Sequence, residues 1–229
     1  MGEVIRKNAA VEDILKDVGT TLTRAVTREG AWRTLAEEKL GGVVTLSNSA
    51  GTALTAAETA YAPLAARIRV EDEKADGAIG KVRDDIYNAL GRAAGDPALS
   101  LLFPGGIGYY ADGMDEGEPD RMELLAELLT AGIHQRLDRA VASSGAQAVR
   151  QAAAPLRAAH DAARLPRARV KLLGLVRTAL GRHGQSQLAA LKRAYQSAGF
   201  TEADIHTVIP DRPTPTPAPK MGPLPPPAT

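Results

Sequence analysis

Apolar residues recur every three or four positions along almost the whole chain, which is the period of an amphipathic α-helix. Seams of this kind cover residues 11–26, 46–90 and 125–156, and a further helix is expected to begin at Pro166. The pattern predicts an all-α protein. We expect an antiparallel bundle of about four long helices with short accessory helices.

Proline, glycine and capping residues mark where these helices should begin and end. Pro63 interrupts the second seam and predicts a kink or a restart. Asp120 and Glu123 have the spacing of a capping box, so the third long helix should begin there. Gly181 and Gly184 are expected to separate the fourth helix from a shorter one that follows.

The two ends of the chain differ in composition from the part between them. Residues 210–229 contain nine prolines, and proline fixes φ and donates no backbone hydrogen bond. This segment is predicted to be a disordered Pro-rich tail. Residues 1–8 form a short N-terminal tail, and residues 9–209 form the helical bundle.

A faint internal repeat suggests how the bundle is organised. The sequences Ala-Pro-Leu and Ala-Leu-Gly-Arg each occur twice, at nearly equal separations. Such matches also arise by chance in alanine-rich helices, so a duplication stays one of two alternatives. In the duplicated form, hairpins 9–95 and 120–200 are joined by the loop 103–119.

Charge is distributed very unevenly along the chain, although the formal net charge is only +1. Residues 150–193 hold ten Lys or Arg against one acidic residue, whereas residues 71–123 hold thirteen Asp or Glu against five basic residues. This asymmetry is the strongest functional signal in the sequence. The basic segment has an acidic counterpart within its own chain.

A helical projection of residues 164–182 separates an apolar arc from a basic strip. The arc comprises Leu165, Leu172, Leu173, Val176, Ala179 and Leu180. Arg169 projects into this arc, and an isolated buried guanidinium is too costly to tolerate. We therefore expect Arg169 to form a structural ion pair with Glu71 or Asp72, which flank the second seam.

Three interpretations of the basic strip remain open. It is a solvated face paired with the acidic half of the chain, a contact for an acidic protein partner or for self-association, or a nucleic-acid interface. Aromatic residues for base stacking are nearly absent around it. The candidate contact residues are Arg164, Arg167, Lys171, Arg182, Lys192 and Arg193.

The acidic loop after residue 111 has a superficial likeness to a calcium loop. Counted from Asp112, Glu116 and Glu123 fall at positions five and twelve of such a loop. Met114 and Pro119 stand where a calcium ligand and a pairing residue belong, so we expect a solvated acidic turn and no metal site.

Other chemistry finds little support in the residue pattern. Glu71, Asp72, Asp76 and His160 offer a third interpretation, a metal or small-ligand site in a helical bundle, but only if they line a pocket. The chain lacks cysteine and has no Gly-x-Ser-x-Gly motif. We expect a non-enzymatic protein without a cofactor.

The sequence as a whole favours a protein that works by contact. It contains no apolar run of about 18–20 residues, so no membrane partner is expected. We expect a cytoplasmic helical scaffold, adaptor or assembly protein that acts through helix faces and its Pro-rich tail. The alternatives are a nucleic-acid-binding protein that uses residues 150–193 and the metal or small-ligand bundle.

Overall fold

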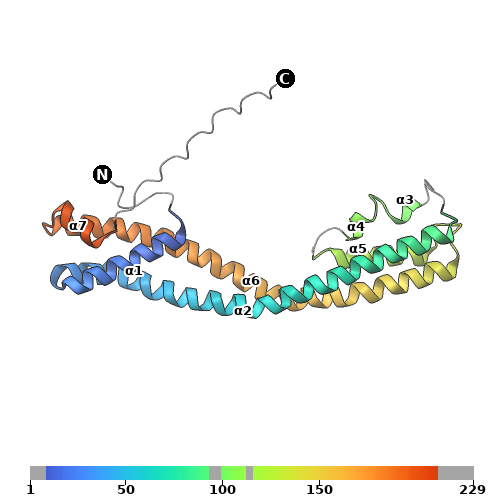
Figure 1. Cartoon of the computed structure of the whole chain (residues 1–229), viewed down its shortest axis with the longest axis horizontal. Helices are drawn as coiled ribbons and strands as arrows, with labels where there is room; N and C mark the ends of the chain where they lie inside the picture. The colour runs from blue at the N-terminus through green and yellow to red at the C-terminus, as the bar shows by residue number, and fades with distance from the viewer. Residues whose placement is uncertain (1–8, 93–98, 112–115, 211–229) are drawn as a thin grey trace, which may run out of the picture. The chain divides into compact units, whose positions relative to one another are not determined.

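The chain is mostly helical in the part that the structure, a computed structural model, describes: residues 9–92, 99–111 and 116–210. These ranges contain no β-strand, which confirms the predicted all-α class. The helices are α1 (Val11–Arg28), α2 (Gly30–Ala89), α3 (Leu99–Leu102), α4 (Gly108–Ala111), α5 (Glu118–Ala131), α6 (Arg139–Ser197) and α7 (Glu202–Val208) (Figure 1). The expected Pro-rich tail and residues 1–8 lie outside the described residues, apart from Pro210.

The chain divides into two compact units, and α2 and α6 contribute to both. Unit 1 comprises residues 1–54 and 173–229, and unit 2 comprises residues 55–172. Each unit therefore combines residues from both of the hairpins considered above. Whether these hairpins arose by duplication stays a prediction.

Unit 1 is built from α1, α7 and the parts of α2 and α6 that belong to it. A tight turn joins α1 to α2, with Glu29 and Gly30 both at positive φ. Its core consists of small and aliphatic residues from all four helices, among them Val18, Leu40 and Leu191. Alanine and glycine at the contacts let the helices approach closely.

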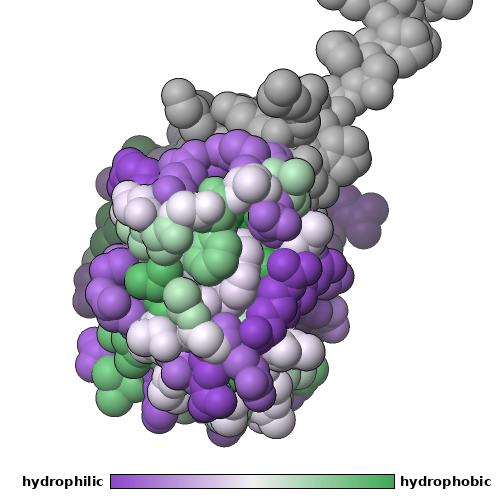
Figure 2. All heavy atoms as spheres, turned by 90° about the vertical axis from the view of Figure 1, so that its left-hand side faces the viewer, coloured by the Kyte–Doolittle hydropathy of each residue, from purple (hydrophilic) through white to green (hydrophobic). Residues whose placement is uncertain are grey.

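Three of the few aromatic residues meet at one end of unit 1. The Trp32 ring stacks on Phe200 with 3.9 Å between centroids and lies 4.5 Å from Tyr195. The buried Tyr195 hydroxyl donates a hydrogen bond of 2.9 Å to the Trp32 carbonyl oxygen. This cluster joins the start of α2 to the end of α6. Figure 2 views this end, where apolar atoms are surrounded by hydrophilic side chains.

Unit 2 contains α3, α4, α5 and the remaining parts of α2 and α6. The parts of α2 and α6 run antiparallel, since Val82 lies against Gly145 whereas Ala57 and Pro166 line the same hollow. The core between them includes Ile79, Leu125 and Leu156. Shorter helices cover one side, and the buried Tyr110 hydroxyl donates to the Leu102 carbonyl oxygen.

Helices α2 and α6 are longer than the sequence analysis predicted. Pro63 lies inside α2, and α6 continues through Pro155 and Pro166. An interior proline costs about 3 kcal/mol, and packing of the flanking turns against the neighbouring helix offsets this cost. The third seam, in contrast, is divided at Gly132, where α5 ends in a left-handed residue.

Gly181 and Gly184 do not end a helix, contrary to expectation. A Cβ on Gly181 would lie 2.9 Å from Val11 Cγ1, and one on Gly184 would lie 3.0 Å from Val18 Cγ2. The two glycines therefore let α1 approach α6 closely in unit 1. The lack of a side chain, and not backbone freedom, explains why these two glycines stand within α6.

The capping box expected at Asp120 and Glu123 does not form. Helix α5 begins at Glu118, and its N-cap residue, Gly117, makes no side-chain cap. The carboxylates of Asp120 and Glu123 bind arginines of α6 instead. Within the described ranges, no helix is both long and apolar enough to cross a membrane.

Candidate functional site

Three arginines of α6 bind the acidic segment that leads into and forms the start of α5. Arg150 Nε lies 2.7 Å from Glu123, Arg157 Nη1 2.5 Å from Asp120, and Arg167 Nη1 2.9 Å from Glu116. Arg157 also donates to the Pro119 carbonyl oxygen. Part of the basic segment therefore faces the chain's own acidic segment within unit 2.

These three ion pairs are exposed to solvent, and their energetic value is correspondingly small. Each exposed pair contributes about 0.2–1 kcal/mol, since water and salt screen the charges. Arg150, Arg157 and Arg167 follow one another along α6, whereas their partners run in the reverse order along the chain. This matches an antiparallel arrangement of α5 and α6. The pairs position α5 on α6, while the apolar core supplies most of the stability.

The six candidate contact residues divide into paired and unpaired side chains. Arg167 binds Glu116, and Lys192 Nζ lies 3.0 Å from Glu202. The other four are exposed and form no ion pair with any residue that the structure describes. These four are Arg164 and Lys171 in unit 2 and Arg182 and Arg193 in unit 1.

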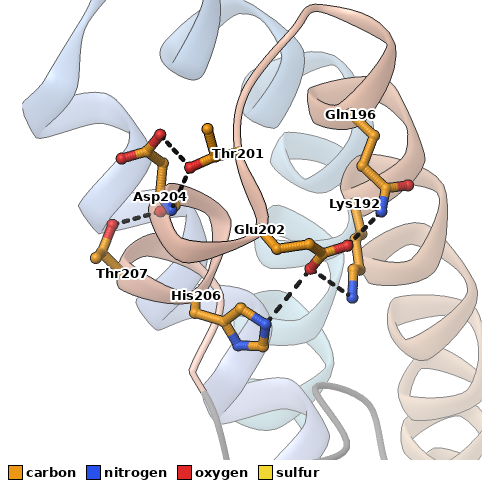
Figure 3. A network of polar contacts seen from close by, with 7 residues as sticks. All are labelled: Lys192, Gln196, Thr201, Glu202, Asp204, His206 and Thr207. Carbon is orange, nitrogen blue, oxygen red and sulfur yellow. Dashed lines mark hydrogen bonds and ion pairs between the residues drawn. The ribbon is translucent and has the colours of Figure 1, made fainter. Parts of the chain in front are cut away.

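Lys192 belongs to a polar network that attaches α7 to α6 in unit 1 (Figure 3). Glu202 accepts from Gln196 and Lys192 and lies 3.4 Å from His206 Nε2. Hydrogen bonds from Lys192 and Gln196 lower the pKa of the Glu202 carboxyl. Thr201 caps α7 through the Asp204 backbone N–H. Lys192 therefore has a structural partner within unit 1.

Arg169 does not form the predicted ion pair with Glu71 or Asp72. Its side chain is exposed, and Glu71 binds Lys74 at 3.0 Å. Because α2 and α6 run antiparallel, Arg169 lies near Ala56 and Ala60. Glu71 lies 15 residues beyond Ala56 on α2, which is ~22 Å along the helix axis. The error lies in the register of the two helices.

Four of the six residues of the apolar arc of α6 are exposed, and Leu173 and Leu180 are half-buried, although the arc was expected to face the core. Leu165 is 75% and Leu172 is 60% exposed, whereas Leu156 and Ala163 of the same helix are buried. Leu165, Pro166 and Arg169 line a hollow of about 290 Å³ together with Ala56, Ala57 and Ala60 of α2. We call Leu165, Leu172 and this hollow the Leu165 surface; all of it lies in unit 2.

The unit 1 part of α6 carries exposed aliphatic residues of its own. Leu175 is 60% and Val176 is 39% exposed. Exposed leucines so close in sequence are unusual on a monomer surface, where large apolar side chains are normally scattered. Leu175 lies outside the apolar arc that was predicted from the sequence, and a helical projection alone does not say which face of a helix meets the core.

A buried carboxyl cluster joins α5 to α2 in unit 2, and the sequence analysis found only part of it. Glu118, the first residue of α5, is fully buried beside Asp72 and Asp76 of α2. Burial raises the pKa of the Glu118 carboxyl to about 8, the charges of Asp72 and Asp76 add to this, and Arg121 opposes it. Glu118 is therefore mostly protonated at neutral pH.

Asp72 and Asp76 were candidate carboxylates in the sequence analysis, whereas Glu118 was missed. The capping-box spacing at Asp120 drew the predicted helix start two residues too late. A glutamate directly before Pro119 is the signal that could have located it, since proline favours the first turn of a helix.

The weak metal candidates are distributed over separate interactions. Glu116 and Glu123 bind Arg167 and Arg150, and Asp112 lies outside the described residues. Over the described ranges, no group of three or more His, Asp or Glu is placed to hold a metal ion. His160 is buried in α6, and its Nε2 has no hydrogen-bond partner there.

A cavity of about 620 Å³ lies at the turn between α5 and α6, apart from the carboxyl cluster. Its lining includes Leu129, Ile133, the buried His134, Leu137 and Arg139, and none of its lining residues is acidic. The cavity and the carboxylates of the third interpretation therefore do not form one site.

Comparison with protein-family models, with curated proteins and with solved structures found no match to this chain.

Proposed function

We propose that the protein is a non-catalytic helical interaction protein that acts by contact through exposed faces of α6. The observation that carries the proposal is the exposure of Leu165 and Leu172, 75% and 60%, beside a hollow floored by alanines. Large aliphatic side chains held in water lose the favourable free energy of burial, and binding a partner restores it. The Pro-rich segment 211–229 is a second contact region in this proposal.

A contact function rather than catalysis is supported by the position of the most perturbed carboxyl. A general acid must reach its substrate, but Glu118 is fully buried beneath the start of α5. Its raised pKa is accounted for by burial and by two neighbouring carboxylates of the same unit.

Site-specific photo-crosslinking tests the proposed function. A benzophenone amino acid replaces Leu172 in the full-length protein, which is then expressed and irradiated in the cells that naturally produce it. The matched control carries the same amino acid at Leu101, another exposed leucine of unit 2. Crosslinked proteins are identified by mass spectrometry, purified, and tested for direct binding.

We expect one protein to crosslink at Leu172 and not at Leu101. The purified partner should bind the wild-type chain directly, and replacing Leu172 by Ser should weaken this binding. Crosslinks that are equal at the two positions, or none at Leu172, would overturn the proposal.

Nucleic-acid binding is the second candidate function, and the unpaired basic residues favour it. Arg164, Lys171, Arg182 and Arg193 are exposed, and phosphate contacts need no sequence motif. Anisotropy titrations with labelled duplex DNA and single-stranded RNA at several salt concentrations test it. Affinity that falls log-linearly with salt, and is lost when these residues become Ala, would support this candidate over the first.

A further inference from the structure

The Leu165 surface has the shape that a single helix fits. Leu165 and Leu172 lie seven residues apart on α6, so they project from one face about 10 Å apart. The hollow beside Leu165 has Ala56, Ala57 and Ala60 as its α2 wall. A side chain from a partner helix can enter this hollow while the two leucines pack along the apolar stripe of that helix, as in knobs-into-holes packing.

The charges around the Leu165 surface are mostly basic, and the exposed acidic exceptions are Asp161, one turn before Leu165, and Glu58 of α2. Arg164, Arg169 and Lys171 are exposed along α6 and form no ion pair with a described residue. On α2, Arg67 is exposed and follows Ala56 and Ala60 on the same helical face. The partner surface should therefore carry acidic side chains on both flanks of its apolar stripe.

A second copy of the chain does not supply such a partner at the same surface. In a two-fold dimer each residue faces its own counterpart or a neighbour from the same patch. Asp161 is the only acidic residue of α6. An antiparallel self-pairing centred between Leu165 and Leu172 would set residues 164 and 171 opposite residues 173 and 166. Arg164 and Lys171 would therefore gain no carboxylate partner, and the basic side chains of the two copies would gather at one interface. Like charges that face each other oppose association.

Nucleic acid also fits this surface less well than a protein. Phosphates would meet the basic side chains, but Leu165 and Leu172 stand in the middle of the patch and offer nothing to a phosphate backbone. A surface with an apolar stripe and basic flanks is complementary to a helix with an apolar stripe and acidic flanks.

We infer that the Leu165 surface binds an acidic amphipathic helix of another protein, with its apolar stripe on Leu165 and Leu172 and its carboxylates near Arg164, Arg169 and Lys171. This inference rests on the proposed function and names the chemistry of the partner. Affinity comes mainly from the apolar contacts, whereas the basic rim sets the association rate and the choice of partner.

The experiment uses two synthetic helical peptides and the full-length chain. The first is a fluorescein-labelled peptide of three heptads with Leu at the a and d positions and Glu at e and g. The second is identical except that Lys replaces each Glu. Binding is followed by fluorescence anisotropy at low and at high salt.

The acidic peptide should bind at low salt and more weakly at high salt, and the lysine peptide should not bind. Replacing both leucines (Leu165→Ser with Leu172→Ser) should weaken binding about tenfold or more, which corresponds to at least ~1.4 kcal/mol. The charge reversal Arg164→Glu with Lys171→Glu should slow association and remove the preference for the acidic peptide. The matched control, Lys81→Glu with Arg83→Glu, reverses two exposed basic residues elsewhere in unit 2 and should change nothing.

Equal binding of the two peptides, or binding that the leucine replacements leave unchanged, would overturn the inference. So would a dimer, detected by sedimentation, that the leucine replacements dissociate, or duplex DNA binding that they abolish. All replaced side chains are exposed, and circular dichroism verifies that each variant is folded.

The crosslinking experiment keeps the two proposals distinguishable. A crosslinked partner that binds directly, combined with no preference for the acidic peptide, would refute the acidic-helix inference and leave the interaction function standing. Failure of both experiments would refute both.

Discussion

Replacing Glu118 by Gln should stabilise the protein at neutral pH, although the carboxyl that it replaces is fully buried. The glutamine amide has nearly the shape of a protonated carboxyl and, like it, offers a donor to the neighbouring Asp72 and Asp76 carboxylates. It carries no charge at any pH. The variant therefore keeps the packing of α5 against α2 and removes the cost of holding a carboxyl protonated in the folded state.

The size and sign of the effect follow from the pKa of Glu118, which is raised from an ordinary 4.5 to about 8. The folded state holds the proton more tightly than the unfolded state, so the carboxyl's contribution is fully present below pH ~4.5 and is lost as pH rises to about 8. At ~1.4 kcal/mol per pKa unit the full shift corresponds to about 5 kcal/mol. Asp72 and Asp76 are only partly buried, and solvent screening reduces the expected effect to about 2–3 kcal/mol.

Urea unfolding followed by far-ultraviolet circular dichroism measures this effect. The two proteins should be about equally stable near pH 4.5, and Glu118→Gln should become the more stable by about 2–3 kcal/mol near pH 8. Glu123→Gln, on the same helix but at an exposed ion pair, is the control and should show no gap that widens with pH. A gap that stays constant, or a wild type that gains on Glu118→Gln as pH rises, would refute the reasoning.

Three further predictions concern packing and exposure. Gly174→Ala adds a methyl group in open space within α6 and should raise the free energy of unfolding by about 0.5–1 kcal/mol, whereas Gly181→Ala meets Val11 and should be no more stable than wild type. Tyr195→Phe removes the hydrogen bond to Trp32 and should lower stability by about 1 kcal/mol; an unchanged urea midpoint would contradict this bond's contribution. Arg169→Ala removes an exposed side chain and should lower the free energy of unfolding by less than ~0.5 kcal/mol. A loss of several kcal/mol would instead indicate that Arg169 forms a buried ion pair.

Most of the fold could be predicted from the helical period, because that period depends only on which positions are apolar. Helix ends were harder to predict, since they depend on tertiary contacts. Pro63 and Pro166 break a helix in isolation, yet flanking turns packed on a neighbouring helix keep α2 and α6 continuous. Glycine is common at helix ends, but Gly181 lies within α6, where Val11 packs against it.

The site was predicted less completely than the fold, for two physical reasons. The charge asymmetry left pairing within the chain open as part of one of three interpretations, and the structure contains such pairs, for example Arg157 with Asp120. The register between α2 and α6 is not encoded in either helix alone, so Arg169 was assigned an ion pair that it does not form. Leu165 and Leu172 were recognised as apolar but were expected in the core. Which arc of a helix is buried depends on the neighbour it meets.

The aromatic cluster of unit 1 has a spectroscopic consequence. Trp32 is the only tryptophan in the chain, and it lies against Phe200 and Tyr195. Tryptophan emission therefore reports the environment at that end of unit 1, whereas helical circular dichroism reports both units. Emission recorded during unfolding follows the separation of α7 and the end of α6 from α2. A change confined to the start of α5, such as Glu118→Gln, would be registered by circular dichroism and not directly by Trp32.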